Sequence, residues 1–126
     1  MTAIALQAAE KPEAAAVLSK AVTRAAERLD VSKSLLAEML GVSQPTITRL
    51  YNGKYLLDAN RKEWNSALLL VRFFGSLNSI AGDEDTARKW LSSENLSLND
   101  RPIELIRNTK GLVRVVQYLD AISGLV

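Results

Sequence analysis

Apolar residues recur three or four positions apart through most of the chain. The segments 13–29 and 112–122 show this spacing most clearly, and it is typical of amphipathic helices. No segment alternates apolar and polar residues between hairpin turns, as a half-buried strand would. The pattern therefore predicts an all-α fold.

Two short helices joined by a tight turn at Gly41 are predicted between Lys33 and Gly53. Gly41 permits the positive φ that such a turn needs. The hydroxyl of Ser43 can cap the second helix, and Pro45 fits its first turn, where a backbone N–H is not needed. Ala37 is small where the second helix crosses the first. The apolar residues that would wedge the helices together are Leu36, Leu40, Val42, Ile47 and Leu50. This arrangement indicates a helix-turn-helix.

The outward side chains of the second helix are of types that reach phosphates and base edges of DNA. With their flanking polar residues they form the predicted DNA-binding set: Lys33, Ser43, Gln44, Thr46, Thr48, Arg49, Asn52 and Lys54. The alternative is a helical hairpin that only packs and never meets DNA, because such hairpins are common in helical proteins. Agreement of several constrained positions in one register favours DNA binding.

The segment 60–78 is apolar almost all round, whereas a surface helix needs only one apolar stripe. In so small a chain we expect a second copy to bury the remaining side. This predicts a homodimer with an interface at Leu69, Leu70, Phe73 and Phe74. The alternative is a central helix wrapped by its own chain. A dimer would also let two recognition helices read a palindromic site.

Composition and charge narrow the class of protein. The chain has 126 residues, is 48% hydrophobic and carries a formal net charge of +2. This length fits one compact domain or two very small ones. Basic residues outnumber acidic ones between Lys20 and Glu63, whereas the two balance from Asn65 onward. The positive excess thus lies with the helix-turn-helix, as phosphate binding would require, although ordinary scatter of surface charge fits the same distribution.

The chain contains no Cys and no His, which excludes disulfides, thiolate nucleophiles, imidazole chemistry and most zinc sites. The acidic residues 83–85 are interpreted as favourable charge at a helix N-terminus and not as metal ligands. We therefore predict no metal, no cofactor and no enzymatic activity. The N-terminus lacks the features of a secretory signal, and the apolar run 67–74 is too short to span a membrane. A soluble cytoplasmic protein is expected.

The C-terminal part carries a recognisable series of residues. The series comprises Trp90-Leu91, Asn95-Leu96, Leu98, Pro102, Leu105-Ile106, Thr109-Lys110-Gly111 and Val115-Val116. From about Asp83 to Gly124 it resembles the toxin-binding domain of Xre/MbcA/ParS-type antitoxins. The part from Lys20 to about Gly82 is similar to the Xre-like helix-turn-helix domain that precedes it. The family usually has Pro-Asn where this chain has Glu94-Asn95, and Gly where it has Asn99 or Asp100.

The resemblance implies a helix-turn-helix and dimerisation domain at 14–82 and a small helical toxin-binding domain at 83–126. It implies an antitoxin that covers the active site of a RES-domain toxin, an enzyme that degrades NAD or ADP-ribosylates a target. It also implies repression of its own operon through operator DNA. The toxin-facing residues that it implies are Trp90, Asn95, Arg107, Lys110, Arg114, Tyr118, Gly124, Leu125 and Val126.

The residues taken alone leave other interpretations open. Trp90 and Tyr118 also fit a hydrophobic core, and the three cations also fit a solvated helix face. A homodimeric transcriptional repressor with no toxin partner is the main alternative function, followed by an interaction protein with a vestigial helix-turn-helix. An enzyme ranks last because no nucleophile–base pair or phosphate-binding glycine loop is present.

Overall fold

The computed structural model describes the backbone of residues 2–124 and the side chains of residues 13–124. The described part forms α1 (Thr2–Arg28), α2 (Lys33–Leu40), α3 (Gln44–Tyr51), α4 (Glu63–Ala81), α5 (Glu84–Ser92), α6 (Pro102–Leu105) and α7 (Thr109–Ser123). Its one non-helical pairing is an isolated bridge between Asn95 and Asp100. The all-α prediction is therefore confirmed. No helix in residues 2–124 is long and apolar enough to cross a membrane.

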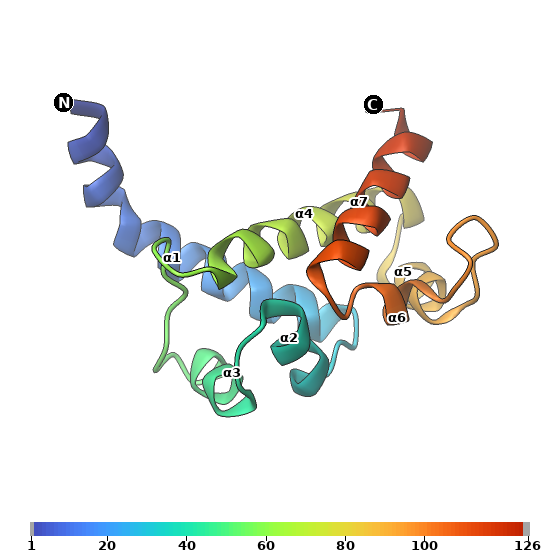
Figure 1. The fold of residues 1–126 in the computed structure, drawn as a ribbon, viewed down its shortest axis with the longest axis horizontal. Coiled ribbons are helices and arrows are strands. Elements are labelled where there is room, and N and C mark those ends of the chain that lie inside the picture. The colour runs from blue at the N-terminus through green and yellow to red at the C-terminus, as the bar shows by residue number, and fades with distance from the viewer. Residues whose placement is uncertain (1, 125–126) are drawn as a thin grey trace.

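Helix α4 lies at the centre of the fold (Figure 1). Its buried stripe includes Ala67, Leu70, Phe73 and Leu77, spaced three or four residues apart. It contacts α1, α2, α5 and α7, so the chain itself buries much of the apolar surface of this helix. A charged contact also joins α4 to α7, because the exposed Arg72 pairs with the buried carboxylate of Asp120.

This packing corrects part of the predicted dimer interface. Leu70 and Phe73 are only 1% and 0% exposed, so their side chains offer no surface to a second copy. They are buried because α7 returns along α4, a long-range contact that the local apolar pattern did not reveal. Leu69 and Phe74 are partly buried, while Leu68 on the outer face is 47% exposed.

Helix α1 is longer than the apolar pattern predicts. It begins at Thr2 and runs through Pro12 to Arg28, whereas the pattern placed its start at Glu13. The Ala-rich sequence on both sides of the proline favours helix. The second half of α1 buries Val22, and Leu29 just beyond its end is buried in the same core.

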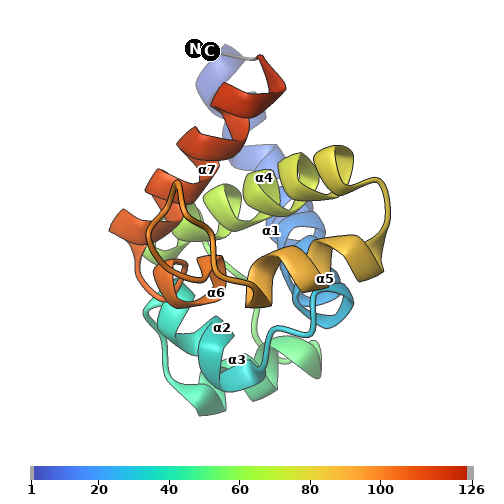
Figure 2. The same ribbon diagram turned by 90° about the vertical axis from the view of Figure 1, so that its right-hand side faces the viewer.

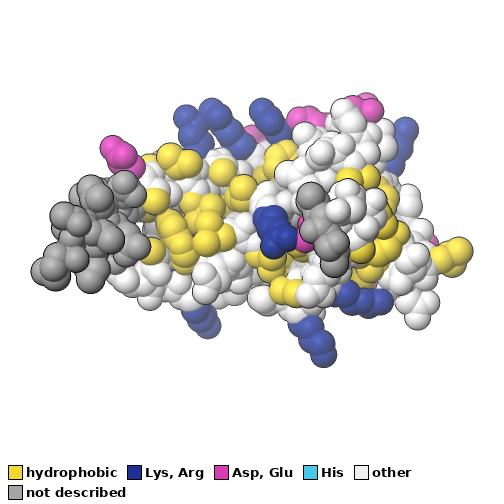
Figure 3. Space-filling model, turned by 90° about the horizontal axis from the view of Figure 1, so that it is seen from above, with side chains coloured by type: hydrophobic (Ala, Val, Ile, Leu, Met, Phe, Trp, Pro, Cys, Tyr) yellow, Lys and Arg dark blue, Asp and Glu magenta, His cyan; other side chains and the backbone are white. Residues whose placement is uncertain are grey.

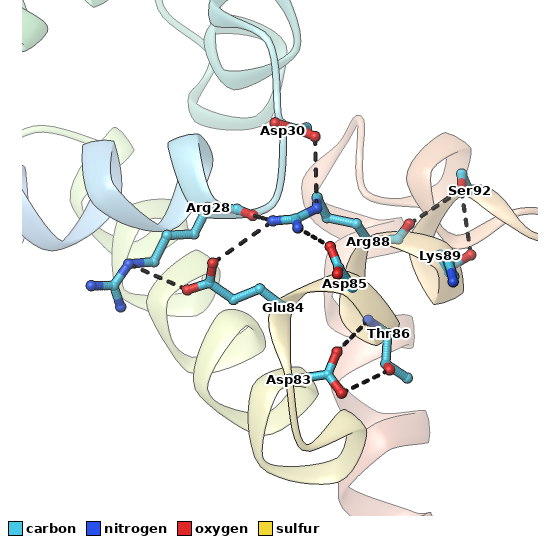
Figure 4. Close-up of polar contacts among 9 residues, drawn as sticks. All are labelled: Arg28, Asp30, Asp83, Glu84, Asp85, Thr86, Arg88, Lys89 and Ser92. Carbon is cyan, nitrogen blue, oxygen red and sulfur yellow. Dashed lines mark hydrogen bonds and ion pairs between the residues drawn. The ribbon is translucent and has the colours of Figure 1, made fainter.

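Ion pairs and a hydrogen bond connect the start of α5 to the end of α1, as Figure 4 shows. The Nη1 of Arg88 donates to the carbonyl oxygen of Arg28 at 2.7 Å, where a helix end leaves carbonyls without partners. Arg88 also lies 3.7 Å from Asp30 Oδ2 and pairs with Asp85, while Arg28 Nε lies 3.6 Å from Glu84 Oε1. This network links the N-terminal and C-terminal parts of the chain.

Asp83 serves as the N-cap of α5. Its carboxylate accepts hydrogen bonds from the Thr86 backbone N–H at 2.7 Å and from the Thr86 hydroxyl at 3.1 Å. These hydrogen bonds hold the pKa of Asp83 below its ordinary value. The acidic residues 83–85 thus stabilise a helix start, as the sequence suggested.

Candidate functional sites

The turn between α2 and α3 has the geometry that its sequence predicts. Gly41 ends α2 with φ +69° and donates its N–H to the carbonyls of Ala37 and Glu38. The Oγ of Ser43 accepts from the Thr46 backbone N–H at 3.2 Å and so caps α3. The apolar side chains between the two helices are buried or half-buried: Leu36, Leu40, Val42, Ile47 and Leu50. The packing fixes the direction in which the outer face of α3 points.

The outer face of α3 carries an ordered row of polar side chains. Ser43 and Thr46 share a hydrogen bond of 2.8 Å between their hydroxyls, and Arg49 Nη2 donates to Thr46 Oγ1 at 3.3 Å. Gln44 donates to the hydroxyl of Ser34 on α2 at 3.3 Å. Thr48 is exposed, and the guanidinium of Arg49 has no carboxylate partner among the described residues. Arg49 is therefore oriented but still available to an external anion.

The remaining predicted DNA-binding residues flank this row. The Nζ of Lys33, at the start of α2, lies 4.8 Å from the centre of the Tyr51 ring. Burial, and secondarily the charge of Glu27, raises the pKa of Tyr51. Asn52 and Lys54 are exposed just beyond the end of α3. Helices α2 and α3 lie on the side of the molecule opposite the two chain ends (Figure 1).

In the C-terminal part, the structure brings Trp90 and Tyr118 together. Their rings stack with centroids 6.4 Å apart and an interplanar angle of 18°. Both side chains are half-buried and pack against the core, so they hold α5 against α7. This matches the core interpretation that the residues alone left open.

Asn95 shapes the loop between α5 and α6. Its backbone N–H donates to the Asp100 carbonyl at 3.1 Å, and its side-chain oxygen accepts from the Leu98 N–H at 3.1 Å. Asn99 has φ +66°, which explains how this chain manages without the usual glycine of the family, because Asn tolerates the left-handed region. The loop presents Leu96, which is 95% exposed and which is not among the predicted toxin-facing residues. The sequence does contain one indication of this site, because Leu96 is an apolar residue among the polar residues of a turn.

A cavity of about 520 Å³ opens between α6 and α7, here called the α6–α7 groove. It is lined by Glu104, Leu105, Asn108, Lys110, Gly111, Val113, Arg114 and Gln117. The α6–α7 groove is narrow at Gly111, where an added Cβ would lie 1.8 Å from the carbonyl oxygen of Leu105. Asn108 caps α7 by accepting from the Gly111 N–H at 2.8 Å. Two predicted toxin-facing residues, Lys110 and Arg114, thus share one recess.

Arg107 lies outside this groove and joins it to the helix-turn-helix. Its Nη1 donates to Glu38 Oε2 of α2 at 3.0 Å, and its Nε donates to Glu104 Oε2 at 3.2 Å. Hydrogen bonds to Glu104 and then to Glu38 raise the pKa of Arg107. The structure therefore gives Arg107 contacts within the chain, between two elements far apart in sequence.

The predicted toxin-facing tail is described only at its first residue. Gly124 ends α7 with φ +77° and donates its N–H to the Ala121 carbonyl at 3.3 Å. Leu125 and Val126 lie outside the described residues. Within the described part, no group of three or more acidic side chains is arranged to hold a metal ion.

A buried two-helix wedge with an exposed polar second helix defines a helix-turn-helix protein of the DNA-binding class. Comparison with family models agrees with this class and extends it. Residues 8–72 match the antitoxin Xre-like helix-turn-helix domain, and residues 76–124 match the antitoxin Xre/MbcA/ParS C-terminal toxin-binding domain. The first match covers more than half of the chain, so the chain belongs to the Xre-like antitoxin family. No curated protein matches the chain.

Proposed function

We propose that this chain is the antitoxin of a type II toxin–antitoxin pair, that its toxin carries a RES domain, and that it represses its own operon. The observation that carries the proposal is the presence of a matched helix-turn-helix domain and a matched toxin-binding domain in one chain. The RES assignment is supported by the resemblance of the series from Trp90 to Val116 to antitoxins that accompany RES toxins. Neutralisation would occur by covering the active site of the toxin.

We place the boundary between the two functional regions at residues 82 and 83. Gly82 ends α4 with φ +87°, and Asp83 begins the next helix as its cap. Residues 14–82 would then serve DNA binding and dimerisation, and residues 83–126 would bind the toxin. The family matches meet a little earlier, within α4, which is consistent with a helix that serves both regions.

The homodimer proposal is supported by an apolar surface on α1 and α4. Val17 of α1 is 69% exposed and Leu68 of α4 is 47% exposed. Figure 3 shows hydrophobic side chains gathered on the face that carries both chain ends. We assign the dimer contact to this face, with Leu69 and Phe74 at the edges of the α4 surface. Because α3 lies on the opposite side of the fold from this face, the two α3 helices of such a dimer would point away from each other and would not read one palindromic site together.

For DNA, we expect α3 to enter the major groove and Arg49 to contact a base. Arg49→Ala should weaken operator binding by about 1–3 kcal/mol and relax specificity at one base pair, because a bidentate contact to a base edge would be lost. The measurement is a gel-shift titration against the upstream DNA and its single-base variants. With the dimer contact on the face opposite α3, each dimer should protect a single half-site that one α3 contacts.

Arg24→Ala is the matched control for this experiment, since it removes the same charge from an exposed position on α1. It should leave base preference unchanged and lower affinity for all sequences alike, if at all. Equal base preference in Arg49→Ala and the wild type would contradict the assigned role of Arg49. Absence of binding to upstream DNA at low salt would contradict the repressor role.

The toxin role is tested by co-production with the product of the neighbouring reading frame. The chain should co-purify with that product and restore growth to cells that produce it, because covering the active site stops the reaction. Arg49→Ala should restore growth as well as the wild type, since Arg49 lies in α3, outside the residues 76–124 that match the toxin-binding domain. If the wild type neither co-purifies nor restores growth while it still binds upstream DNA, the chain is a repressor with no toxin partner.

A further inference from the structure

The α6–α7 groove combines an apolar interior with cations that remain available at its rim. Leu105, Val113 and the backbone of Gly111 supply much of the apolar lining. Lys110 has no carboxylate partner among the described residues. The one acidic residue of the lining is Glu104. The groove therefore favours an apolar group with negative charge beside it.

The charge of Glu104 is already balanced within the chain. Arg101 Nη2 lies 3.3 Å from Glu104 Oε1, and Arg107 Nε lies 3.2 Å from Glu104 Oε2. The carboxylate consequently does not neutralise Lys110 or Arg114, the two cations of the rim. An incoming carboxylate would pair with these cations at the edge of an apolar recess, where screening by water is reduced.

The loop that carries Leu96 stands beside the α6–α7 groove. Arg114, which lines the groove, donates from Nη2 to the Leu98 carbonyl at 2.9 Å. Leu98 is 2% exposed and anchors the loop, whereas Leu96 is 95% exposed. Figure 2 shows this loop next to α6 and α7. Arg114 thus connects the α6–α7 groove to the loop that presents Leu96.

The loop is also ordered before any partner arrives. Three hydrogen bonds close it: Asn95 N–H to the Asp100 carbonyl, Asn99 N–H to the Asn95 carbonyl at 2.8 Å, and Leu98 N–H to the Asn95 side chain. A side chain presented from a closed loop loses little further conformational freedom on binding. Leu96 is therefore a suitable anchor for insertion into a partner.

We propose that this surface is the recognition site for the toxin, and that it receives a toxin segment carrying an apolar side chain next to a carboxylate. The apolar side chain enters the α6–α7 groove, the carboxylate pairs with Lys110 and Arg114, and Leu96 inserts into the toxin in return. The inference rests on the proposed antitoxin function. All of these residues lie within the region that matches the toxin-binding domain, and the apolar α1–α4 face is left to a second copy.

The test uses the full-length chain and the purified RES-domain product of the neighbouring reading frame as probe. Lys110→Glu and Leu96→Ser should each raise the dissociation constant of the complex with the toxin by at least about tenfold, because each removes a central contact. Both residues are exposed, so the melting temperature of the free chain should stay unchanged. Calorimetry at two salt concentrations should also show that the toxin affinity of Lys110→Glu depends less on salt than that of the wild type.

Lys89→Glu and Ile80→Ser are the matched controls, since both positions are exposed in the same matched region but do not line the groove. Each should stay within about twofold of the wild type. Wild-type affinity in both Lys110→Glu and Leu96→Ser would overturn this inference while leaving the antitoxin role intact. A change in the oligomeric state of the free protein in either variant would overturn the inference, because it would show that a second copy of the chain occupies this surface. Failure of the wild type to bind would overturn both proposals together.

Discussion

Gly111→Ala should be destabilised by about 3 kcal/mol or more, because the new Cβ has no space. The nearest atom, the Leu105 carbonyl oxygen, would lie 1.8 Å away, and it belongs to the backbone, which cannot move aside as a side chain can. Relief of the overlap would require α6 to separate from α7. Urea denaturation followed by circular dichroism measures the loss, and toxin binding should decline with it.

Gly75→Ala is the control for this prediction. Gly75 lies inside α4 and its added Cβ would have nothing within 4 Å, so alanine should stabilise the chain by about 0.5–1 kcal/mol through higher helix propensity. The two alanine variants should thus shift the denaturation midpoint in opposite directions. A stable Gly111→Ala variant would contradict the close approach of the two helices.

Phe73→Ala should lower the free energy of unfolding by about 3–5 kcal/mol, the range for truncating a fully buried aromatic side chain. Phe73 is 0% exposed and belongs to the core that α4 shares with α1, α2, α5 and α7. Operator binding and toxin binding should therefore be lost together. Thermal denaturation, operator gel shifts and toxin calorimetry on the same preparation measure the three effects.

Ile80→Ala on the same helix is the matched control. Ile80 is 41% exposed, so its truncation should change stability by only about 0.5 kcal/mol. Loss of toxin binding with full operator binding in Phe73→Ala would show that the N-terminal and C-terminal parts fold independently. Loss of operator binding and of toxin binding at the same temperature would show that the chain unfolds as a single cooperative unit.

The helix-turn-helix could be predicted from sequence because its determinants are local. Gly41 supplies the left-handed turn, and Ser43 caps α3 by accepting from the N–H of Thr46, three residues later. The apolar wedge follows from helical spacing. None of these depends on residues far along the chain. The same is true of Asp83, whose cap contact is with Thr86.

The surroundings of α4 could not be predicted in this way. An apolar pattern indicates that a side will be covered, but it does not indicate whether α7 of the same chain or a second copy covers it. Leu70 and Phe73 were assigned to a partner and are instead buried within the chain. Arg107 is a similar case, because its acceptor Glu38 is 69 residues away in sequence.

The α6–α7 groove also could not be predicted from the sequence. Its shape depends on how closely Gly111 approaches Leu105, a tertiary distance that residue spacing does not encode. The pattern nevertheless selected Lys110 and Arg114, because the resemblance covers α7. Leu96 was missed since single exposed leucines are common on protein surfaces and only its ordered loop distinguishes it.

The contacts of Arg88 with α1 and of Arg107 with α2 have a consequence for communication between the two bound partners. Each exposed ion pair contributes at most about 1 kcal/mol, but both act in addition to the shared α4 core. Helix α3 and the α6–α7 groove are thus connected by a shared core and by these two contacts. A bound toxin would then alter operator occupancy by steric clash or by bridging neighbouring complexes, and not by releasing a tethered DNA-binding domain.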